Sequence, residues 1–168
     1  MKTGQYGIER EEDSAPVEML ASLCEARGWS FDFAAEDEIT AEIQGSWANY
    51  QLRGIWRQED HVLQLICLPD IRVPDDKRAP MFEVLAMVNE QMWLGHFDVW
   101  SNGMVLLYRH ALMLGDDGLL SLGQAQTAVE AAIEECDRFY PAFQFILWGD
   151  KSPTEALAAA MVDAAGEA

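Results

Sequence analysis

The sequence predicts an α+β domain in which helices pack on an antiparallel sheet of about five to six strands. Apolar residues recur at helical spacing in three separate stretches, whereas the stretches between them alternate apolar and polar residues as strands do. Short polar turns join the alternating stretches, which favours antiparallel neighbours. The expected order along the 168 residues is helix, three or four strands, helix, two strands, helix.

The first helix is predicted over residues 14–27, with Ser14 as the N-cap and Gly28 as a left-handed C-cap. A strand with one buried face should follow at residues 29–33. Further strands are predicted at residues 39–44, 47–57 and 61–68. The first two alternate between apolar and polar residues, whereas the last is apolar at odd and even positions alike, as a central strand would be.

The second helix is predicted to end near Leu94, with Pro80 in its first turn and Gly95 closing it. Two strands should then flank Asn102-Gly103, a pair that fits a type I′ hairpin turn because both positions accept positive φ.

The third helix should begin at Ser121, whose spacing to Gln124 allows a capping box. It should bend at Pro141, which lacks the backbone N–H, and end at Gly149. A second capping signature at Ser152 predicts a short helix in the tail.

Length and composition favour a single domain, because about 70% of the surface of a chain of this size is buried on folding. The domain is placed at residues 14–149. Residues 1–13 are expected to be a mobile N-terminal segment, and residues 150–168 an acidic, Ala-rich C-terminal tail.

The formal net charge of −18 comes from 29 acidic and 11 basic side chains. Such a field repels phosphate backbones and anionic lipids, so nucleic-acid and membrane partners are not expected. The residues at the start of the chain lack the apolar core of a signal peptide, and three widely spaced cysteines lie in apolar stretches. A cytoplasmic location with reduced, structural thiols follows as the expectation.

The sequence contains no motif that points to catalysis. Its three histidines, His61, His96 and His110, lack the close spacing of zinc signatures, and no nucleophile elbow, phosphate loop or dinucleotide fingerprint is present. Asp98 shares a strand face with His96, so an acid/base pair is one reading. The prediction is nevertheless a protein that is not an enzyme and needs no cofactor or metal.

Six tryptophans exceed what the core of a small domain usually needs. Partly exposed aromatic rings favour interaction surfaces, and the broad apolar stripe that includes Phe143 and Trp148 is the stretch expected to form one. A pocket between the sheet and the second helix is an alternative. Its expected lining is Trp47, Tyr50, Trp93 and Trp100, and Trp56 is a further candidate on the sheet.

Residues 88–112, VNEQMWLGHFDVWSNGMVLLYRHAL, resemble the bacterial YbjN-domain family. The likeness lies in an asparagine near the end of the second helix, a short link, and a hairpin whose second strand carries an arginine. Over residues 14–149 the order of elements also agrees. By this resemblance Asn89 and Arg109 are family-pattern positions. On physical grounds, Asn89 is expected to bind backbone carbonyls of the link that follows the helix, and Arg109 to pair with a sheet carboxylate such as Asp98.

The resemblance also implies a fold similar to type III secretion chaperones, whose chains pair into dimers. The family is described as sensory-transduction regulators, a label without an established reaction. The functional prediction is therefore a non-enzymatic, chaperone-like or regulatory protein-interaction module that acts as a homodimer and binds an unknown protein. The alternative is a small-molecule sensor with the aromatic-lined pocket described above.

Overall fold

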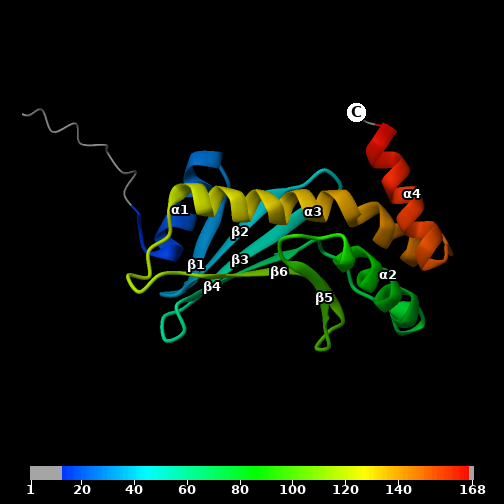
Figure 1. The fold of residues 1–168 in the computed structure, drawn as a ribbon, viewed down its shortest axis with the longest axis horizontal. Helices are drawn as coiled ribbons and strands as arrows, with labels where there is room; N and C mark the ends of the chain where they lie inside the picture. Colours follow the sequence, from blue (N-terminus) through cyan, green and yellow to red (C-terminus); the bar gives the residue numbers. More distant parts are fainter. Residues whose placement is uncertain (1–12, 167–168) are drawn as a thin grey trace, which may run out of the picture.

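A computed structural model describes residues 13–166 as one antiparallel sheet with helices packed against it (Figure 1). The elements in chain order are α1 Pro16–Arg27, β1 Phe31–Ala35, β2 Glu38–Gln44, β3 Asn49–Arg57, β4 Val62–Leu68, the 3-10 turn η1 Asp75–Lys77, α2 Arg78–Glu90, β5 His96–Trp100, β6 Val105–Met113, α3 Leu122–Trp148 and α4 Pro153–Gly166. The strand order in the sheet is β1-β2-β3-β4-β6-β5. The predicted α+β class and order of elements are confirmed.

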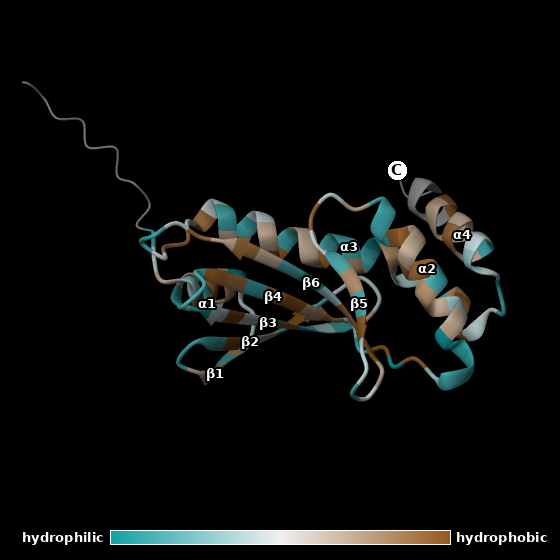
Figure 2. Ribbon diagram, turned by 60° about the horizontal axis from the view of Figure 1, so that its bottom comes forward, coloured by the Kyte–Doolittle hydropathy of each residue, from teal (hydrophilic) through white to brown (hydrophobic). Residues whose placement is uncertain are grey.

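The central strands form the apolar centre of the sheet. β4 lies between β3 and β6 and is hydrophobic along most of its length (Figure 2). Leu65 and Cys67 on one of its faces and Ile66 on the other are almost completely buried, as predicted for a central strand. In β2, Ile39, Ala41 and Ile43 are buried as their alternation predicted.

The helices divide into two groups. α1 and α3 pack against the sheet, α1 on β2 and β3, and α3 on β4 and β6. α2 and α4 pack on each other and on α3, beyond the β5 end of the sheet (Figures 1 and 2). Phe97 of β5 joins the groups, because its ring makes edge-to-face contacts with Phe139 and Phe143 of α3 at 6.1 and 5.0 Å between centroids.

Two predictions at the N-terminal end were wrong. The N-cap of α1 is Ala15, because the backbone of Ser14 is committed to Leu120, with N···O distances of 3.2 and 2.9 Å. β1 begins two residues later than predicted and buries no face, since α1 packs on β2 and β3. Phe33 is more than half exposed as a result. Gly28 does close α1 in the left-handed conformation.

The second helix and the hairpin also differ from the prediction. α2 ends at Glu90, before Leu94, and Gly95 precedes β5 instead of capping the helix. The hairpin loop has positive φ at Gly103 and Met104, so it is not the two-residue Asn102-Gly103 turn. Met104 is held by the preceding loop, whose Val73 N–H donates to the Met104 carbonyl at 2.9 Å, and this contact favours the longer loop.

α3 and α4 form the C-terminal part of the fold. The capping box of Ser121 and Gln124 is present, and α3 continues through Pro141, after which Figure 1 shows it inclined away from its first half, as the predicted bend requires. α4 starts with a capping box at Ser152 and packs on α2 and α3, burying Leu157. Part of the apolar stripe near the end of α3 is therefore buried within this chain, where α4 packs on α3, while Trp148 stays exposed.

Candidate interaction surface

β6 extends past the strand beside it. β5 pairs with β6 only from Val105 to Arg109, whereas β4 pairs with β6 as far as Met113. Within the described residues, no strand lies along the outer side of residues 110–113. The sheet therefore has a gap at this place, with β4 on one side of the strand end and an open edge on the other.

Asn89 and Gly95 determine where β5 starts. The Asn89 side chain accepts from the Phe97 N–H at 2.8 Å and donates to the Phe97 carbonyl at 3.0 Å. Gly95 has φ +68°, and a Cβ there would overlap the Tyr108 ring and lie 2.9 Å from the Arg109 carbonyl oxygen. The Tyr108 hydroxyl donates to the Leu94 carbonyl at 2.9 Å. Together these contacts hold Leu94 and Gly95 against Tyr108 and Arg109, and strand pairing along this edge of β6 ends there instead of continuing beside residues 110–113.

The exposed backbone groups differ between the two strands. The Leu114 N–H donates to the His61 carbonyl. Because hydrogen-bonded and non-hydrogen-bonded pairs alternate along an antiparallel ladder, the backbone N–H and C=O groups of Ala111 and Met113 point away from β4. On the outer edge of β5, Asn89 binds both groups of Phe97, and the Val99 N–H donates to the Asp98 side chain at 2.8 Å. The β5 edge is thus largely satisfied by side chains, whereas the β6 end is open.

A groove runs between this strand end and α3. Its first part has a volume of about 410 Å³ and is lined by Leu94, His110, Leu112, Gly123, Gln124, Thr127 and Ala128. Its second part, about 340 Å³, shares Leu94 and Thr127 and adds Gln91, Trp93, Glu130, Ala131, Glu134, Glu135 and Arg138. We call the two parts together the β6 groove.

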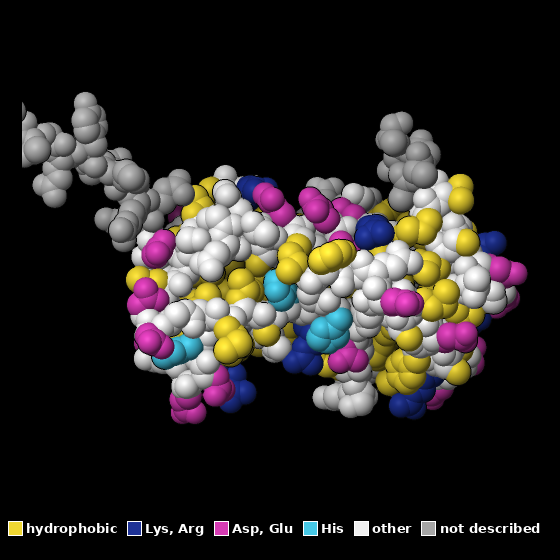
Figure 3. Space-filling view, in the orientation of Figure 1, with side chains coloured by type: hydrophobic (Ala, Val, Ile, Leu, Met, Phe, Trp, Pro, Cys, Tyr) yellow, Lys and Arg dark blue, Asp and Glu magenta, His cyan; other side chains and the backbone are white. Residues whose placement is uncertain are grey.

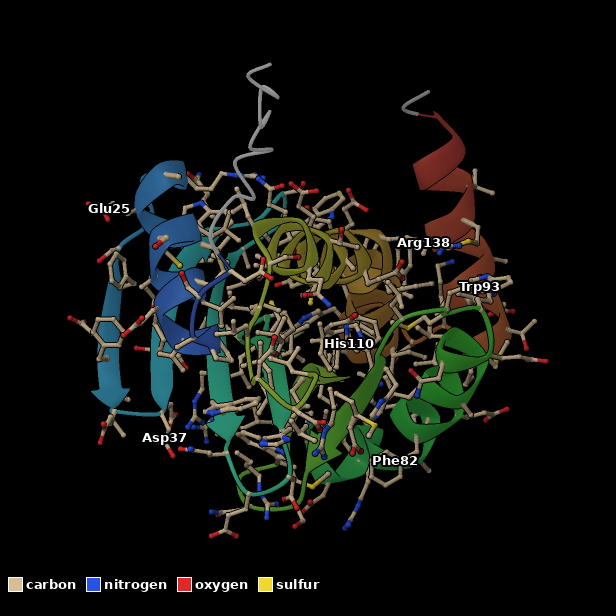
Figure 4. The ribbon with its side chains drawn as sticks, turned by 60° about the vertical axis from the view of Figure 1, so that its left-hand side comes forward. Glu25, Asp37, Phe82, Trp93, His110 and Arg138 are labelled. Atoms are coloured by element: carbon tan, nitrogen blue, oxygen red, sulfur yellow. The ribbon has the colours of Figure 1, made fainter. Side chains whose placement is uncertain are left out.

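Large apolar side chains are exposed at the β6 groove and on the strand end beside it. Trp93, which is 99% exposed, and Leu94, which is 43% exposed, line the groove, and Met113, at the end of β6, is 86% exposed. Figure 3 shows hydrophobic side chains in the hollow below α3, with acidic side chains along the helix above it. Figure 4 shows His110 beneath α3 and Trp93 at the outside, on the link between α2 and β5. Exposed aromatic and aliphatic side chains in such a cluster are typical of a binding surface.

Two titratable side chains in the β6 groove have buried atoms without hydrogen-bond partners. These atoms are His110 Nδ1 and Glu135 Oε2. Burial lowers the pKa of His110, so its imidazole is neutral at pH 7. Burial also raises the pKa of Glu135, although Arg138, at 3.8 Å, opposes that shift. A ligand group that hydrogen-bonds His110 would satisfy a polar atom that the described chain leaves unpaired.

Trp47 and Tyr50 have structural roles. The Tyr50 hydroxyl donates to Asp137 Oδ1 at 2.7 Å, and Trp47 Nε1 donates to the Asp137 carbonyl at 3.0 Å. Ser46 donates two further hydrogen bonds to the same carboxylate. Burial, followed by the bond to Asp137, raises the pKa of Tyr50. These contacts hold the β2–β3 turn against α3.

The four residues of the predicted aromatic pocket are not gathered there. Tyr50 is fully buried and Trp93 almost fully exposed. The registers place Leu52, Cys67, Tyr108 and Phe97 in one row on the α3 side of the sheet. Tyr50 shares that face by parity, whereas Trp100, three residues after Phe97, lies on the opposite face.

The remaining candidates are dispersed. Trp56 stacks on His61 at 6.2 Å, and Phe143 is buried with its ring against Phe97 of β5. Trp148 is largely exposed at the end of α3. Among the described residues Arg109 forms no ion pair with Asp98, whose carboxylate binds the Val99 N–H instead. Asn89 does bond backbone, as the sequence suggested, but in β5 beyond the link.

The other chemical readings gain no support from the geometry. Within residues 13–166, no group of three or more His, Cys, Asp or Glu side chains gathers as metal ligands would. Cys24, Cys67 and Cys136 are buried and unpaired. A hydrogen bond with Cys67, together with burial, raises the pKa of Cys136, which keeps that thiol protonated. No helix in the described part of the chain is long and apolar enough to cross a bilayer.

Comparison with known proteins identifies the class. The YbjN family model, described as "putative bacterial sensory transduction regulator", matches residues 16–145. The chain belongs to this family, which confirms the resemblance in the sequence. No curated protein matches the chain significantly.

Two solved structures share the fold. The crystal structure of YbjN from E. coli is 13% identical, with a TM-score of 0.54, and the match covers 75% of this chain and 90% of that one. The ExsC–ExsE complex gives 15% identity and a TM-score of 0.52, covering 76% and 96%. ExsC is a type III secretion chaperone, so the secretion-chaperone-like fold is also confirmed.

Most of the residues that line the β6 groove are not predicted by the sequence analysis. Trp93 was a candidate for a pocket, and His110 was considered only as a metal ligand. Leu94, Leu112 and Met113 gave no local signal, because the groove exists only where β6 outruns β5. The available signal was the unequal length of the two apolar stretches on either side of Asn102-Gly103.

Gly95→Ala should destabilise the protein more than Gly28→Ala. Both glycines have positive φ, but only a Cβ at residue 95 meets backbone and the Tyr108 ring. We expect a loss of about 1 kcal/mol for Gly28→Ala and about 3 kcal/mol for Gly95→Ala in the free energy of unfolding, measured by urea denaturation. Equal losses would contradict the close approach of the link to β6.

His110→Gln should reduce the loss of stability on acidification. Because the pKa of His110 is below 6.5 in the folded protein, the unfolded chain takes up the proton first as the pH falls through 6.5. The wild type therefore loses free energy of unfolding on acidification, while well above pH 6.5, where both states hold a neutral imidazole, this histidine contributes no slope. Urea unfolding at pH values between about 5 and 8 measures the slope. His96→Gln, at an exposed position, is the control, and an unchanged slope in His110→Gln would refute the prediction.

Proposed function

We propose that the protein is a non-enzymatic, chaperone-like or regulatory module that binds another protein through the β6 groove and acts as a homodimer. The observation that carries the proposal is the cluster of exposed apolar side chains around an open strand end, with Trp93 fully outside the fold. Because the Trp93 side chain is exposed to water, it contributes no hydrophobic burial energy to the stability of the folded chain. A partner that covers it would gain that energy on binding.

Membership of a family of sensory-transduction regulators and the fold of a secretion chaperone support a regulatory or chaperone-like role. The lining of the β6 groove is consistent with binding, because the apolar side chains of its first part adjoin the glutamates and Arg138 of its second part.

We place the interface of the proposed homodimer on a different surface. Phe82 of α2, Trp148 at the end of α3 and Val162 of α4 are exposed at the helical end of the molecule. Figure 3 shows hydrophobic side chains spread over α2 and α4. We call these three residues the helical-end surface. A second copy that pairs there would leave the β6 groove free for a different protein.

The small-molecule sensor finds less support. Its pocket needed Trp47, Tyr50, Trp93 and Trp100 together, and Tyr50 and Trp100 lie on opposite faces of the sheet. No observation favours it over protein binding.

The solution mass tests the homodimer. Light scattering after size exclusion, at tens of micromolar chain, should give twice the chain mass of 18.8 kDa. Trp148→Ala should raise the dissociation constant about tenfold or more, since an exposed tryptophan at the centre of an interface is a common hot spot. Phe33→Ala, at an exposed aromatic on the far edge strand, should change nothing. A single-chain mass at the highest concentration would refute the homodimer.

Crosslinking tests the binding surface. Benzoylphenylalanine in place of Trp93, expressed in the organism of origin and irradiated, should yield a covalent adduct with a protein other than a second copy. The same photoreactive residue in place of Glu25, exposed on α1 far from the β6 groove, should yield none (Figure 4). Absence of adducts from position 93, or identical adducts from position 25, would remove the protein-binding proposal.

A further inference from the structure

We infer that the β6 groove binds an extended segment of another protein, which adds as an antiparallel strand to residues 110–113 of β6. The segment carries apolar side chains at alternate positions and Lys or Arg at both ends. This inference rests on the proposed function and specifies the chemistry of the partner.

The backbone of β6 supplies the first argument. The peptide groups of Ala111 and Met113 point away from β4, and within residues 13–166 no strand pairs with them. β5 does not extend to cover them, because Leu94 and Gly95 are held against Tyr108 and Arg109, where pairing along this edge ends. An added strand would satisfy these groups and continue the sheet.

The side chains supply the second argument. His110 and Leu112 face α3, since they pair with the buried Leu65 and Leu63 of β4. Alternate residues of an added strand would face the same side and enter the first part of the groove. That part, with a volume of about 410 Å³ between Leu94, Leu112 and Ala128, suits aliphatic side chains. The neutral His110 imidazole leaves this lining without a charge.

Charge supplies the third argument. Asp116 and Asp117 follow β6 at one end of the open edge. Glu134 and Glu135 line the second part of the groove at the other end, where Arg138 is the one basic side chain among its lining residues. A segment with basic residues at both ends matches both groups of carboxylates. A Lys or Arg side chain of the segment next to Trp93 would also form a cation–π contact with the Trp93 ring.

Other occupants fit less well. A second copy pairing its own β6 end here would bring Asp116 and Asp117 of one chain close to acidic residues of the other. The other open edge of the sheet, β1, carries a register irregularity between Phe33 and Ala35, which disturbs continuous pairing.

The test uses designed peptides on the full-length protein. The probe is acetyl-Lys-Arg-Thr-Leu-Thr-Val-Thr-Arg-Lys-amide, and the charge control replaces every Lys and Arg by Glu. Two further peptides carry one N-methyl group, either on the threonine between Leu and Val or on the Leu. In an antiparallel strand whose Leu and Val face α3, the N–H of that threonine points to β6 and the N–H of Leu points away.

Calorimetry should show binding of the probe and none of the Glu peptide. N-methylation of the central threonine should weaken binding about tenfold or more, and N-methylation of Leu should leave it nearly unchanged. Amide NMR shifts should centre on residues 110–113. Trp93→Ala should weaken binding about tenfold, whereas Phe33→Ala, on the β1 edge, should not.

Several results would overturn the inference: equal effects of the two N-methyl groups, shifts centred on β1, or binding of the Glu peptide in place of the probe. A fall in solution mass caused by Ala111→Pro would assign the edge to a second copy and also overturn it. If benzoylphenylalanine in place of Trp93 crosslinks to a protein while the peptides show no strand pattern, the proposed function stands and strand addition is wrong. If the crosslinks fail as well, both are wrong.

Discussion

The two hydrogen bonds between the Asn89 side chain and the Phe97 backbone are the contacts on which the arrangement of the candidate surface depends. They occupy the N–H and carbonyl that an edge strand would otherwise leave open, and they hold the end of α2 beside the start of β5. Because β5 is held there, Phe97 inserts its ring between Phe139 and Phe143 of α3. The same contact decides that β5 stops short of the end of β6. One amide side chain therefore links the aromatic core to the open edge.

α4 determines which part of α3 remains available to a partner. The apolar stretch of α3 near Phe143 and Ile146 is buried inside this chain, with Phe143 against Phe97 of β5, and α2 and α4 pack on the same helix. The first half of α3 lies on β4 and β6 and presents Gln124, Thr127 and Glu134 at its outer side. The apolar stripe predicted from the sequence thus belongs largely to the core. The proposed binding surface lies instead at the more polar half of the helix, where β6 forms the other wall of the groove.

The sequence predicted elements whose signals are local and failed where the answer depends on a non-local register. The alternation of Ile39, Ala41 and Ile43 and the capping box of Ser121 are complete within a few residues, and both were confirmed. Tyr50 and Trp93 are both aromatic side chains with a polar group. Tyr50 is nevertheless buried and hydrogen-bonded to Asp137, whereas Trp93 is exposed to water. That difference arises because Asp137 and Tyr140 of α3 lie against Tyr50, whereas Trp93 lies on the link between α2 and β5. The β6 groove exists because β6 is longer than β5. This difference in length cannot be predicted from the sequence of either strand alone.

An open strand edge is a hazard in any protein, since it can pair with copies of itself, and the acidity of this chain bears on that problem. The open stretch covers only residues 110–113, α3 overhangs one of its faces, and carboxylates stand at both of its ends. Two identical chains approaching through these edges would oppose like charges, whereas a basic segment would neutralise them. The net charge of −18 therefore does more than keep copies apart. In the proposed strand addition, the carboxylates at this edge disfavour a second copy of the chain and favour a cationic strand from another protein.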